Sequence, residues 1–155
     1  GKPVTDTDFL GQYILVYFGF TNCPEVCPTE MAKQSRAIQM VDEEVGPVVT
    51  PVFISVDPFR DTPAQVDKYC QAFHPRMVGL TGTTEQVKSV ARAYRVYFNE
   101  TARNSEQEYL IDHSIIQYFM GRDGKFLHYF GNNMSEREMA DKMKAAILEH
   151  KDRVV

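Results

Sequence analysis

No hydrophobic run in this sequence is long enough to cross a lipid bilayer; the longest, "YILVYFGF" at residues 13–20, has the length of a β-strand. Basic residues are not in excess either: 17 Lys and Arg against 21 Asp and Glu give a net charge of −4, which argues against nucleic-acid binding. Repeats, low-complexity tracts and linker-like segments are also missing. At 155 residues, 43% of them hydrophobic, the chain suits one buried core. We therefore predict a single globular domain over residues 1–155.

Cysteine is scarce as well. Three cysteines are too few, and an odd number, for a small secreted fold held together by disulfides. The chain opens with "GKPVTDTDFLGQY", which contains neither an initiator Met nor a targeting signal. We expect an excised soluble domain whose targeting signal and any membrane anchor precede Gly1.

Strand-like and helix-like segments alternate along the chain. Continuous apolar runs predict strands covered on both faces at Tyr13–Phe20, Val48–Val56 and Tyr109–Met120. A short strand is expected near "MVGL", and the turn "GRDG" joins the third run to "KFLHYF" as an antiparallel hairpin. Parallel strands joined by helices and closed by a hairpin predict an α/β, thioredoxin-like fold, with a central mixed sheet flanked by helices.

The predicted helices begin with a common pattern. Thr62–Gln65, Thr83–Gln86 and Ser135–Glu138 each match a capping box, in which a hydroxyl residue is followed three positions later by Glu or Gln. The stretch from Cys27 to Glu30 has the same form, with Pro at the second position and sulfur in place of the hydroxyl. We therefore expect Cys27 to cap a helix, where free amides and the helix dipole favour a thiolate.

The stretch "FGFTNCPEVCPTE" supports three chemical interpretations of Cys23 and Cys27. A thiol–disulfide oxidoreductase is the first, but such enzymes use C-x-x-C and a facing proline; here three residues intervene, and no proline directly precedes Tyr109. A thiol peroxidase is the second, but the activating Thr is replaced by Phe20 or Pro24. A soft metal site is the third, and it requires a further ligand. Such a loop ends at the carboxyl edge of a strand, where sites in α/β sheets gather.

Among four histidines, His113 is the best candidate for that ligand. It lies in "LIDHSII", where Asp112, His113 and Ser114 interrupt an apolar run, and burial of unpaired polar groups costs roughly 1–3 kcal/mol each. The others have simpler interpretations: His74 as a surface or loop residue, His128 as an ordinary strand residue, and His150 as part of a fraying last turn. Two thiolates and one imidazole favour copper over zinc, which prefers four ligands.

Several segments together resemble the Sco proteins, the copper chaperones that help assemble cytochrome c oxidase. These segments are "FGFTNCPEVCP", "ISVDPFRDTP", "VGLTG", "VARAYRVYF" and "DHSIIQYFM", in order over nearly the whole chain. The resemblance implies a thioredoxin-like domain that binds copper, as Cu(I) and also Cu(II), through Cys23, Cys27 and His113. It also implies delivery to the dinuclear copper centre of cytochrome c oxidase subunit II.

The resemblance further implies a location and partners. An N-terminal helix outside this sequence would anchor the domain in the mitochondrial inner membrane, facing the intermembrane space, with the bacterial periplasm as the alternative. The expected partners are subunit II, an upstream copper-carrying chaperone and, as a candidate, a second copy of the chain. We expect that the protein is not an enzyme. The alternative function is that of a thiol–disulfide oxidoreductase, which reduces the recipient's cysteines. Because a Cys23–Cys27 disulfide would occupy the ligand atoms, the thiols must be reduced before copper binds.

Other residues have weaker assignments. Asp112, Asp57 and Arg60 are candidates for supporting or docking roles beside the site, although Asp and Pro in such a turn also serve the backbone. Phe59 stands where the family commonly has an acidic residue, and its role is left open. Cys70 is expected to be a buried bystander. The family domain usually opens with a β-hairpin whose first strand would precede Gly1, and the segment Asn99–Tyr109 is expected to be a variable loop.

Overall fold

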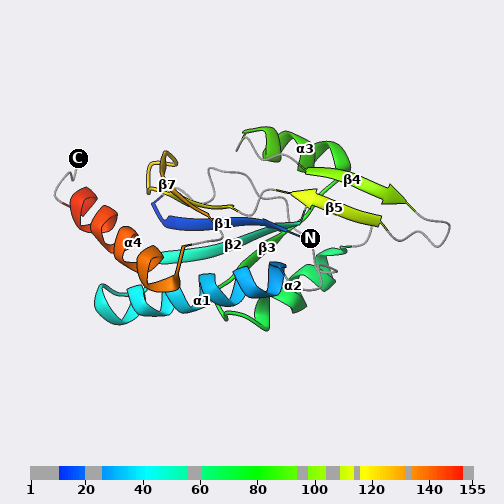
Figure 1. Cartoon of the computed structure of the whole chain (residues 1–155). Coiled ribbons are helices and arrows are strands. Elements are labelled where there is room, and N and C mark those ends of the chain that lie inside the picture. Colours follow the sequence, from blue (N-terminus) through cyan, green and yellow to red (C-terminus); the bar gives the residue numbers. More distant parts are fainter. Residues whose placement is uncertain are drawn as a thin grey trace.

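The computed structural model describes residues 11–19, 26–55, 61–93, 98–103, 109–113, 116–131 and 134–151. Strands and helices alternate within them (Figure 1). In chain order they are β1 (Tyr13–Gly19), α1 (Val26–Glu44), β2 (Val49–Ser55), α2 (Pro63–Gln71), β3 (Val78–Leu80), α3 (Thr84–Ala93), β4 (Phe98–Arg103), β5 (Tyr109–His113), β6 (Ile116–Met120), β7 (Phe126–Gly131) and α4 (Glu136–Lys151).

Five strands form the central sheet, in the order β3-β2-β1-β6-β7. β1, β2 and β3 are parallel, whereas β6 runs antiparallel to β1 and β7 antiparallel to β6. All seven residues of β1 are buried, as the apolar run predicted for a strand in the middle of a covered sheet. In Figure 1, α1 lies below this sheet and α3 above it, so helices cover both faces.

The antiparallel pairing of β1 with β6 determines which chain ends meet. Tyr17 of β1 pairs with Gln117 of β6, and Ile14 pairs with Met120. The carboxyl end of β1 therefore lies beside the amino end of β6. Gly19, the last residue of β1, and Ile116, the first residue of β6, therefore lie at the same edge of the sheet.

The β6–β7 hairpin confirms the prediction from "GRDG". Gly124 has φ of 80°, a conformation that glycine adopts without steric strain. The turn is closed by three hydrogen bonds: Gly121 N donates to the Lys125 carbonyl at 2.8 Å, Gly124 N donates to the Gly121 carbonyl at 3.0 Å, and Lys125 N donates to Asp123 Oδ1 at 3.0 Å.

All three predicted capping boxes are confirmed. Gln65 N donates to Thr62 Oγ1 at 3.2 Å, and Thr62 N donates to Gln65 Oε1 at 3.0 Å. The other two boxes, Thr83–Gln86 and Ser135–Glu138, show the same reciprocal bonds. Each box satisfies two backbone amides that the first helical turn leaves without intrahelical partners.

The single strand predicted over Tyr109–Met120 is wrong. Residues 109–113 form β5, which pairs with β4 in a separate two-stranded sheet, and residues 116–120 form β6 in the central sheet. The break coincides with the polar interruption "DHS". The loop predicted at Asn99–Tyr109 is also wrong at its start, because β4 extends to Arg103; residues 104–108 lie outside the described part of the chain. The polar residues mark the break, but the apolar residues on either side of them do not indicate which sheet each half joins.

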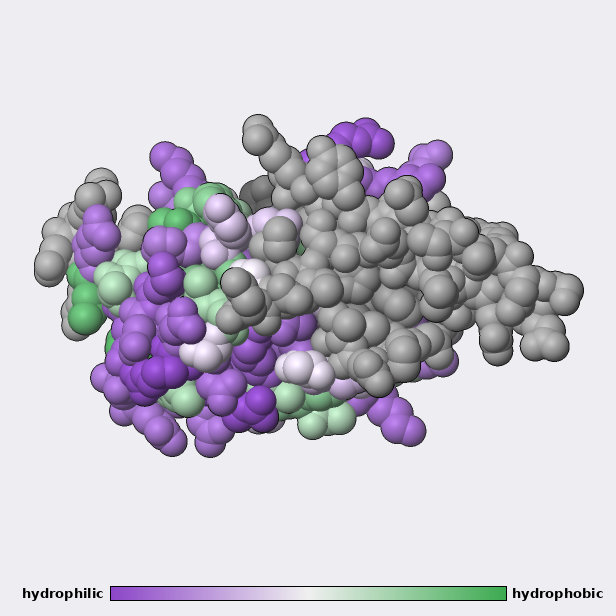
Figure 2. All heavy atoms as spheres, in the orientation of Figure 1, coloured by the Kyte–Doolittle hydropathy of each residue, from purple (hydrophilic) through white to green (hydrophobic). Residues whose placement is uncertain are grey.

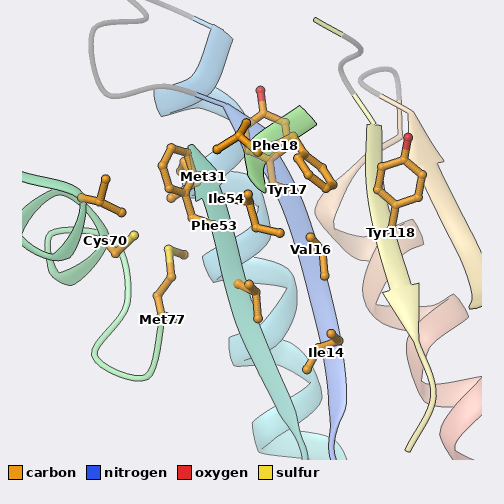
Figure 3. Packing of buried hydrophobic residues seen from close by; sticks show 13 residues of the cluster. Ile14, Val16, Tyr17, Phe18, Met31, Phe53, Ile54, Cys70, Met77 and Tyr118 are labelled. Carbon is orange, nitrogen blue, oxygen red and sulfur yellow. The ribbon is translucent and has the colours of Figure 1, made fainter. Parts of the chain in front are cut away.

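Two hydrophobic clusters stabilise the central sheet. In one, α1 packs against α4 over the sheet through buried apolar side chains, among them Ile38, Val41, Phe119, Met139 and Met143. The other contains Val16, Phe18, Met31, Phe53, Val66, Cys70 and Met77 (Figure 3). The methionines at 31, 139 and 143 are fully buried, which confirms their predicted packing role.

The contact between β3 and α2 is especially close. A Cβ atom added at Gly79 would lie 2.6 Å from Val66 Cγ1 and 2.9 Å from Cys70 Sγ. Only glycine therefore lets β3 approach α2 this closely without displacing those side chains.

Among the described residues, no helix combines the length and the apolar character that a membrane span requires. Where residues are described, the face seen in Figure 2 is mostly hydrophilic, with hydrophobic residues in small separate groups. The largest exposed apolar side chains include Phe126 and Tyr129 of β7, which stack on each other with ring centroids 6.0 Å apart.

Candidate metal and thiol site

Cys27 lies in the first turn of α1. The helix begins at Val26, so Cys27 is its second residue, and the prediction that Cys27 is the cap is wrong by two positions. Pro28 is consequently the third residue, which is still within the first four positions, whose amides have no intrahelical acceptor. The electrostatic argument survives this correction, because the helix dipole acts throughout the first turn.

The side chains of the predicted ligands are not among the parts that the structure describes. Cys23 lies outside the described residues, and Cys27 and His113 are described only as members of α1 and β5. His113 is the last residue of β5 and pairs with Phe98 of β4, and its neighbour Asp112 pairs with Asn99. Ligation by Cys23, Cys27 and His113, and a supporting role for Asp112, therefore stay predictions.

A hydrogen bond nevertheless connects α1, which carries Cys27, to β6, the strand that follows β5 and His113 along the chain. Gln117 Nε2 on β6 donates to the backbone carbonyl of Glu30 on α1 at 3.3 Å. Glu30 is three residues after Cys27, and Gln117 is four residues after His113. A three-residue step rises about 4.5 Å along a helix, and four extended residues span about 13 Å. Cys27 therefore lies about one helical turn from this contact, whereas for His113 the chain length sets only an upper limit of about 13 Å.

Sequence reasoning missed a buried polar cluster beside that contact, made of Glu30, Lys33, Gln34 and Gln117. These side chains are 0–7% exposed. Lys33 Nζ lies 2.8 Å from Glu30 Oε2, and Gln34 Nε2 donates to the Leu15 carbonyl of β1 at 2.9 Å. The sequence did contain a signal that these polar residues are buried. Glu30 and Gln34 flank the core residue Met31 on the helix, and Gln117 interrupts an apolar strand.

The carboxyl edge of β2 carries a second buried polar contact. Ser55 Oγ donates to Asp61 Oδ2 at 2.6 Å, and both residues are essentially inaccessible to solvent. Thr81 Oγ1, just after β3, donates to the Asp61 carbonyl at 3.4 Å. These bonds hold both ends of the segment 56–60, but Asp57, Phe59 and Arg60 themselves lie outside the described residues. Their supporting or docking roles stay predictions.

Cys70 differs from the two motif cysteines. It is a free thiol, fully buried in α2, and burial, together with the negative charge of Asp67, raises its pKa to about 12. A thiol with this pKa is protonated at neutral pH and is a poor nucleophile and a poor metal ligand. The prediction that Cys70 is a buried bystander is confirmed.

The other histidines have surroundings that differ from one another. His74 follows α2 in a loop, as predicted, but it is buried, which contradicts a surface position. Its Nδ1 accepts a hydrogen bond from Arg76 N at 3.0 Å. Burial lowers the pKa of His74, the charge of Arg76 lowers it further, and Asp42 opposes both. His128 is exposed on β7 and stacks on Phe130, as expected of an ordinary strand residue, whereas the side chain of His150 lies outside the described part.

This architecture has well-characterised counterparts. Solved structures that are similar to this chain include Arabidopsis thaliana ScoI with copper bound (44% identity, TM-score 0.92, covering 96% of this chain and 92% of that one). They also include yeast Sco1 with copper bound (39% identity, TM-score 0.85, covering 98% and 82%). A third is BsSco (25% identity, TM-score 0.69, covering 96% and 88%), in which a disulfide switch was identified and which is described as a member of the Sco family of cytochrome c oxidase assembly proteins. The fold is thioredoxin-like, as predicted.

The family model SCO1/SenC matches residues 1–148, and the chain belongs to this family. Relatives include the human protein SCO1 homolog, mitochondrial (48% identity over 141 residues, 90% of this chain and 47% of the relative). Another is the Arabidopsis thaliana protein SCO1 homolog 1, mitochondrial (44% identity over 151 residues, 97% and 45%). The chain therefore spans about half the length of the curated relatives that it matches.

Proposed function

We propose that this chain is a copper metallochaperone, which binds copper through Cys23, Cys27 and His113 and delivers it to the dinuclear copper site of cytochrome c oxidase subunit II. One observation in the structure carries the proposal. The Gln117–Glu30 hydrogen bond joins α1, which carries Cys27, to β6, which begins three residues after His113. The copper bound in the Arabidopsis and yeast structures adds support from the family.

The proposed chemistry is ligand exchange. Thiolates favour Cu(I), and an imidazole completes a three-coordinate set that also accepts Cu(II) if an oxygen ligand is added. His113 lies on a different element from the two cysteines, and we infer that it leaves first when copper passes to the recipient's sulfur ligands. An upstream copper-carrying chaperone supplies the ion. By analogy with relatives named mitochondrial, the site of action is the intermembrane space, at the inner membrane.

Thiol–disulfide exchange is the second candidate function, and the disulfide switch named for BsSco favours it. In this reaction the Cys23 and Cys27 thiols become a disulfide, while a disulfide in the recipient takes up the two electrons and two protons. The two functions use the same thiols and differ in their need for His113. A metal site requires the imidazole, whereas a simple dithiol reductant does not.

Anaerobic titration with Cu(I) tests the proposal. The native domain is compared with Cys23→Ser, Cys27→Ser and His113→Ala, each in competition with a coloured Cu(I) chelator. We expect both serine variants to lose high-affinity binding and His113→Ala to bind more weakly with its thiols still titratable. Equal binding by all four proteins would place the copper site elsewhere. Unchanged affinity in His113→Ala alone would instead favour the reductase function.

Cys70 provides an internal control for the thiol assignments. Because its pKa is raised to about 12, a disulfide reagent at pH 8 should modify two thiols rapidly in the reduced native protein. The third should react only after unfolding. Rapid modification of all three thiols would show that Cys70 is accessible, and the copper site could then not be assigned to the other two cysteines by reactivity.

A further inference from the structure

β7 forms one edge of the central sheet. Among the strands that the structure describes, it pairs with β6 on one side and with no strand on the other. The opposite edge is β3, which is three residues long and packs closely against α2. Charged residues and proline commonly protect exposed strand edges from pairing with another chain. Phe126–Gly131, which we call the β7 edge, contains no Asp, Glu, Lys, Arg or Pro and therefore lacks this protection.

A β-bulge gives this edge an exposed aromatic surface. Phe126 pairs with Met120 of β6, and Tyr129, three residues further on, pairs with Tyr118. Met120 and Tyr118 are two residues apart and share a face of the sheet. Because opposite residues in an antiparallel pair project from the same face, Phe126 and Tyr129 share that face too. Their rings stack with centroids 6.0 Å apart, and the two residues, which we call the aromatic pair, are 51% and 64% exposed.

The aromatic pair continues a buried cluster to the surface. Tyr118 of β6 is 9% exposed, and its ring contacts that of Phe18 edge to face, with centroids 6.2 Å apart. Both residues belong to the hydrophobic cluster on this face of the sheet, with Tyr118 at its margin (Figure 3). In Figure 2, a group of hydrophobic residues lies where Figure 1 places β7. Exposed apolar surface that adjoins a core and an unpaired strand edge indicates contact with another extended chain.

We propose that the β7 edge is a self-association surface, on which a second copy of the chain pairs its own β7 in antiparallel orientation. A twofold axis perpendicular to the sheet relates two such strands, so that one surface supplies both sides of the contact. The same axis places the aromatic pairs of the two copies on one face, where their four rings pack together. This inference does not depend on copper binding.

Charge favours a second copy as the occupant of this edge. The chain has a net charge of −4, so two copies repel each other in most orientations, but the β7 edge is uncharged. The turn 122–125 before β7 has two basic residues and one acidic residue, whereas Glu136 and Glu138 lie in the first turn of α4, just after β7. Antiparallel pairing brings the start of each β7 to the end of the other. The basic turn of each copy therefore approaches the acidic start of α4 in its partner.

The proposed interface is small. Stable complexes bury about 800 Å² on each partner. The six residues of the β7 edge extend over about 20 Å, and together with the aromatic pair they cover less than that area. We therefore expect a dimer that forms only at high protein concentration, with a dissociation constant of about 10 µM or above.

Sedimentation velocity of the whole chain, from about 5 to about 500 µM, measures this equilibrium. Phe126→Lys and Tyr129→Lys each place like charges close together across the twofold axis. Val48→Lys is the matched control, because Val48 is another exposed apolar residue and it precedes β2, which β1 and β6 separate from β7. The urea midpoint of each variant shows whether the monomer is still folded.

We expect Phe126→Lys and Tyr129→Lys to raise the dissociation constant of the dimer by about tenfold or more, and Val48→Lys to leave it unchanged. Amide hydrogen exchange of the native chain locates the interface independently. Protection of amides in the β7 edge should increase with protein concentration, whereas protection in β2, at the centre of the sheet, should stay constant. If a lysine variant fails to fold, the exchange experiment on the native chain decides the matter.

Three outcomes would overturn the inference in distinguishable ways. A native chain that stays monomeric at every concentration would show that the edge does not bind a second copy. A dimer that persists unchanged in folded Phe126→Lys and Tyr129→Lys would place the interface elsewhere. Strong protection of the β7 edge that is the same at low and high concentration would show that a segment of the same chain covers it.

Discussion

Two lysine–glutamate pairs of equal length stand at opposite ends of α1. At the amino end, Lys33 Nζ lies 2.8 Å from Glu30 Oε2, with both side chains less than 10% exposed. At the carboxyl end, Lys144 Nζ of α4 lies 2.8 Å from Glu44 Oε2, with the side chains 20% and 42% exposed. The distance is the same, but the surrounding medium differs. Coulomb attraction between two charges is several times stronger in the protein interior than at the surface. The free-energy cost of removing one partner, which leaves the other charge unpaired, is also larger in the interior.

The exposed end of α1 is a network rather than a pair. Arg137 contacts both Glu44 and Asp141, and Lys144 contacts the same two acids. A hydrogen bond from Lys144 lowers the pKa of Glu44 first of all, and one from Arg137 lowers the pKa of Asp141. Such surface groups remain solvated and are screened by salt, so their contribution to stability is small. The comparison teaches that an ion pair's position relative to solvent, rather than its length, determines its effect on stability.

The largest expected effect comes from Lys33→Met. This change removes the cation beside the buried Glu30 carboxylate, and loss of one member of a buried pair typically costs about 3–5 kcal/mol. Urea unfolding of the variant measures the loss directly. Lys144→Met, at the other end of α1, is the control and should change stability much less. Equal losses in the two variants would contradict the comparison.

A smaller effect is expected for Gln34→Met. The change removes the buried hydrogen bond to the Leu15 carbonyl, which costs about 1–3 kcal/mol, and also removes a buried oxygen that lacks a partner, which offsets part of that cost. The net loss should be visible as a lower urea midpoint with an unchanged slope. Gln39→Met, at an exposed position of the same helix, should leave the midpoint in place. A gain in stability for Gln34→Met would mean that the offset exceeds the lost bond.

The last turn of α1 provides a pH-dependent test. Asp42 of α1 binds Arg76 at 2.9 Å, next to His74, whose pKa is lowered mainly by burial. The unfolded chain therefore binds a proton at His74 more readily than the folded chain does. Stability should fall as the pH drops through about 6.5, the unfolded pKa, and level off below the folded pKa. In His74→Gln this part of the decline should disappear; an identical pH profile would show that other groups cause it.

The smallest effect is expected for Arg137→Ala, at the exposed carboxyl end. The melting temperature should fall by about 2 °C or less. In 0.5 M NaCl the difference from the native protein should shrink, because salt screens exposed charges. A large loss that persists in high salt would mean that this network behaves like the buried pair.

Local sequence signals predicted the helix starts and most of the central sheet. Capping boxes such as Thr62–Gln65 are formed by residues three positions apart, so the sequence contains all of their partners. The pairing of β4 with β5 depends on contacts between separate segments, and the apolar pattern of Tyr109–Met120 was equally compatible with one strand. Periodicity reports burial but not which sheet a strand joins.

The sequence predicted where in the fold the site lies, but not how the side chains around it are arranged. The motif residue Cys27 does lie in the first turn of a helix after a buried strand, although two positions further into the helix than expected. The burial of Glu30 and Lys33 was not foreseen, because charged residues on a helix usually face solvent. Such burial depends on partners that lie on β1 and β6, and the positions of the Cys23, Cys27 and His113 sulfur and nitrogen atoms stay predictions.

The narrow space between β3 and α2 also constrains how this domain can diverge. A side chain larger than hydrogen at position 79 would collide with Val66 and Cys70, so alanine there is tolerated only after position 66 has become smaller. The order of the two substitutions then matters. If position 66 becomes smaller first, the intermediate contains a small cavity; if alanine at position 79 comes first, the intermediate contains a steric clash. Positions 66, 70 and 79 should therefore show epistasis, with each restricting the residues that the others can accept.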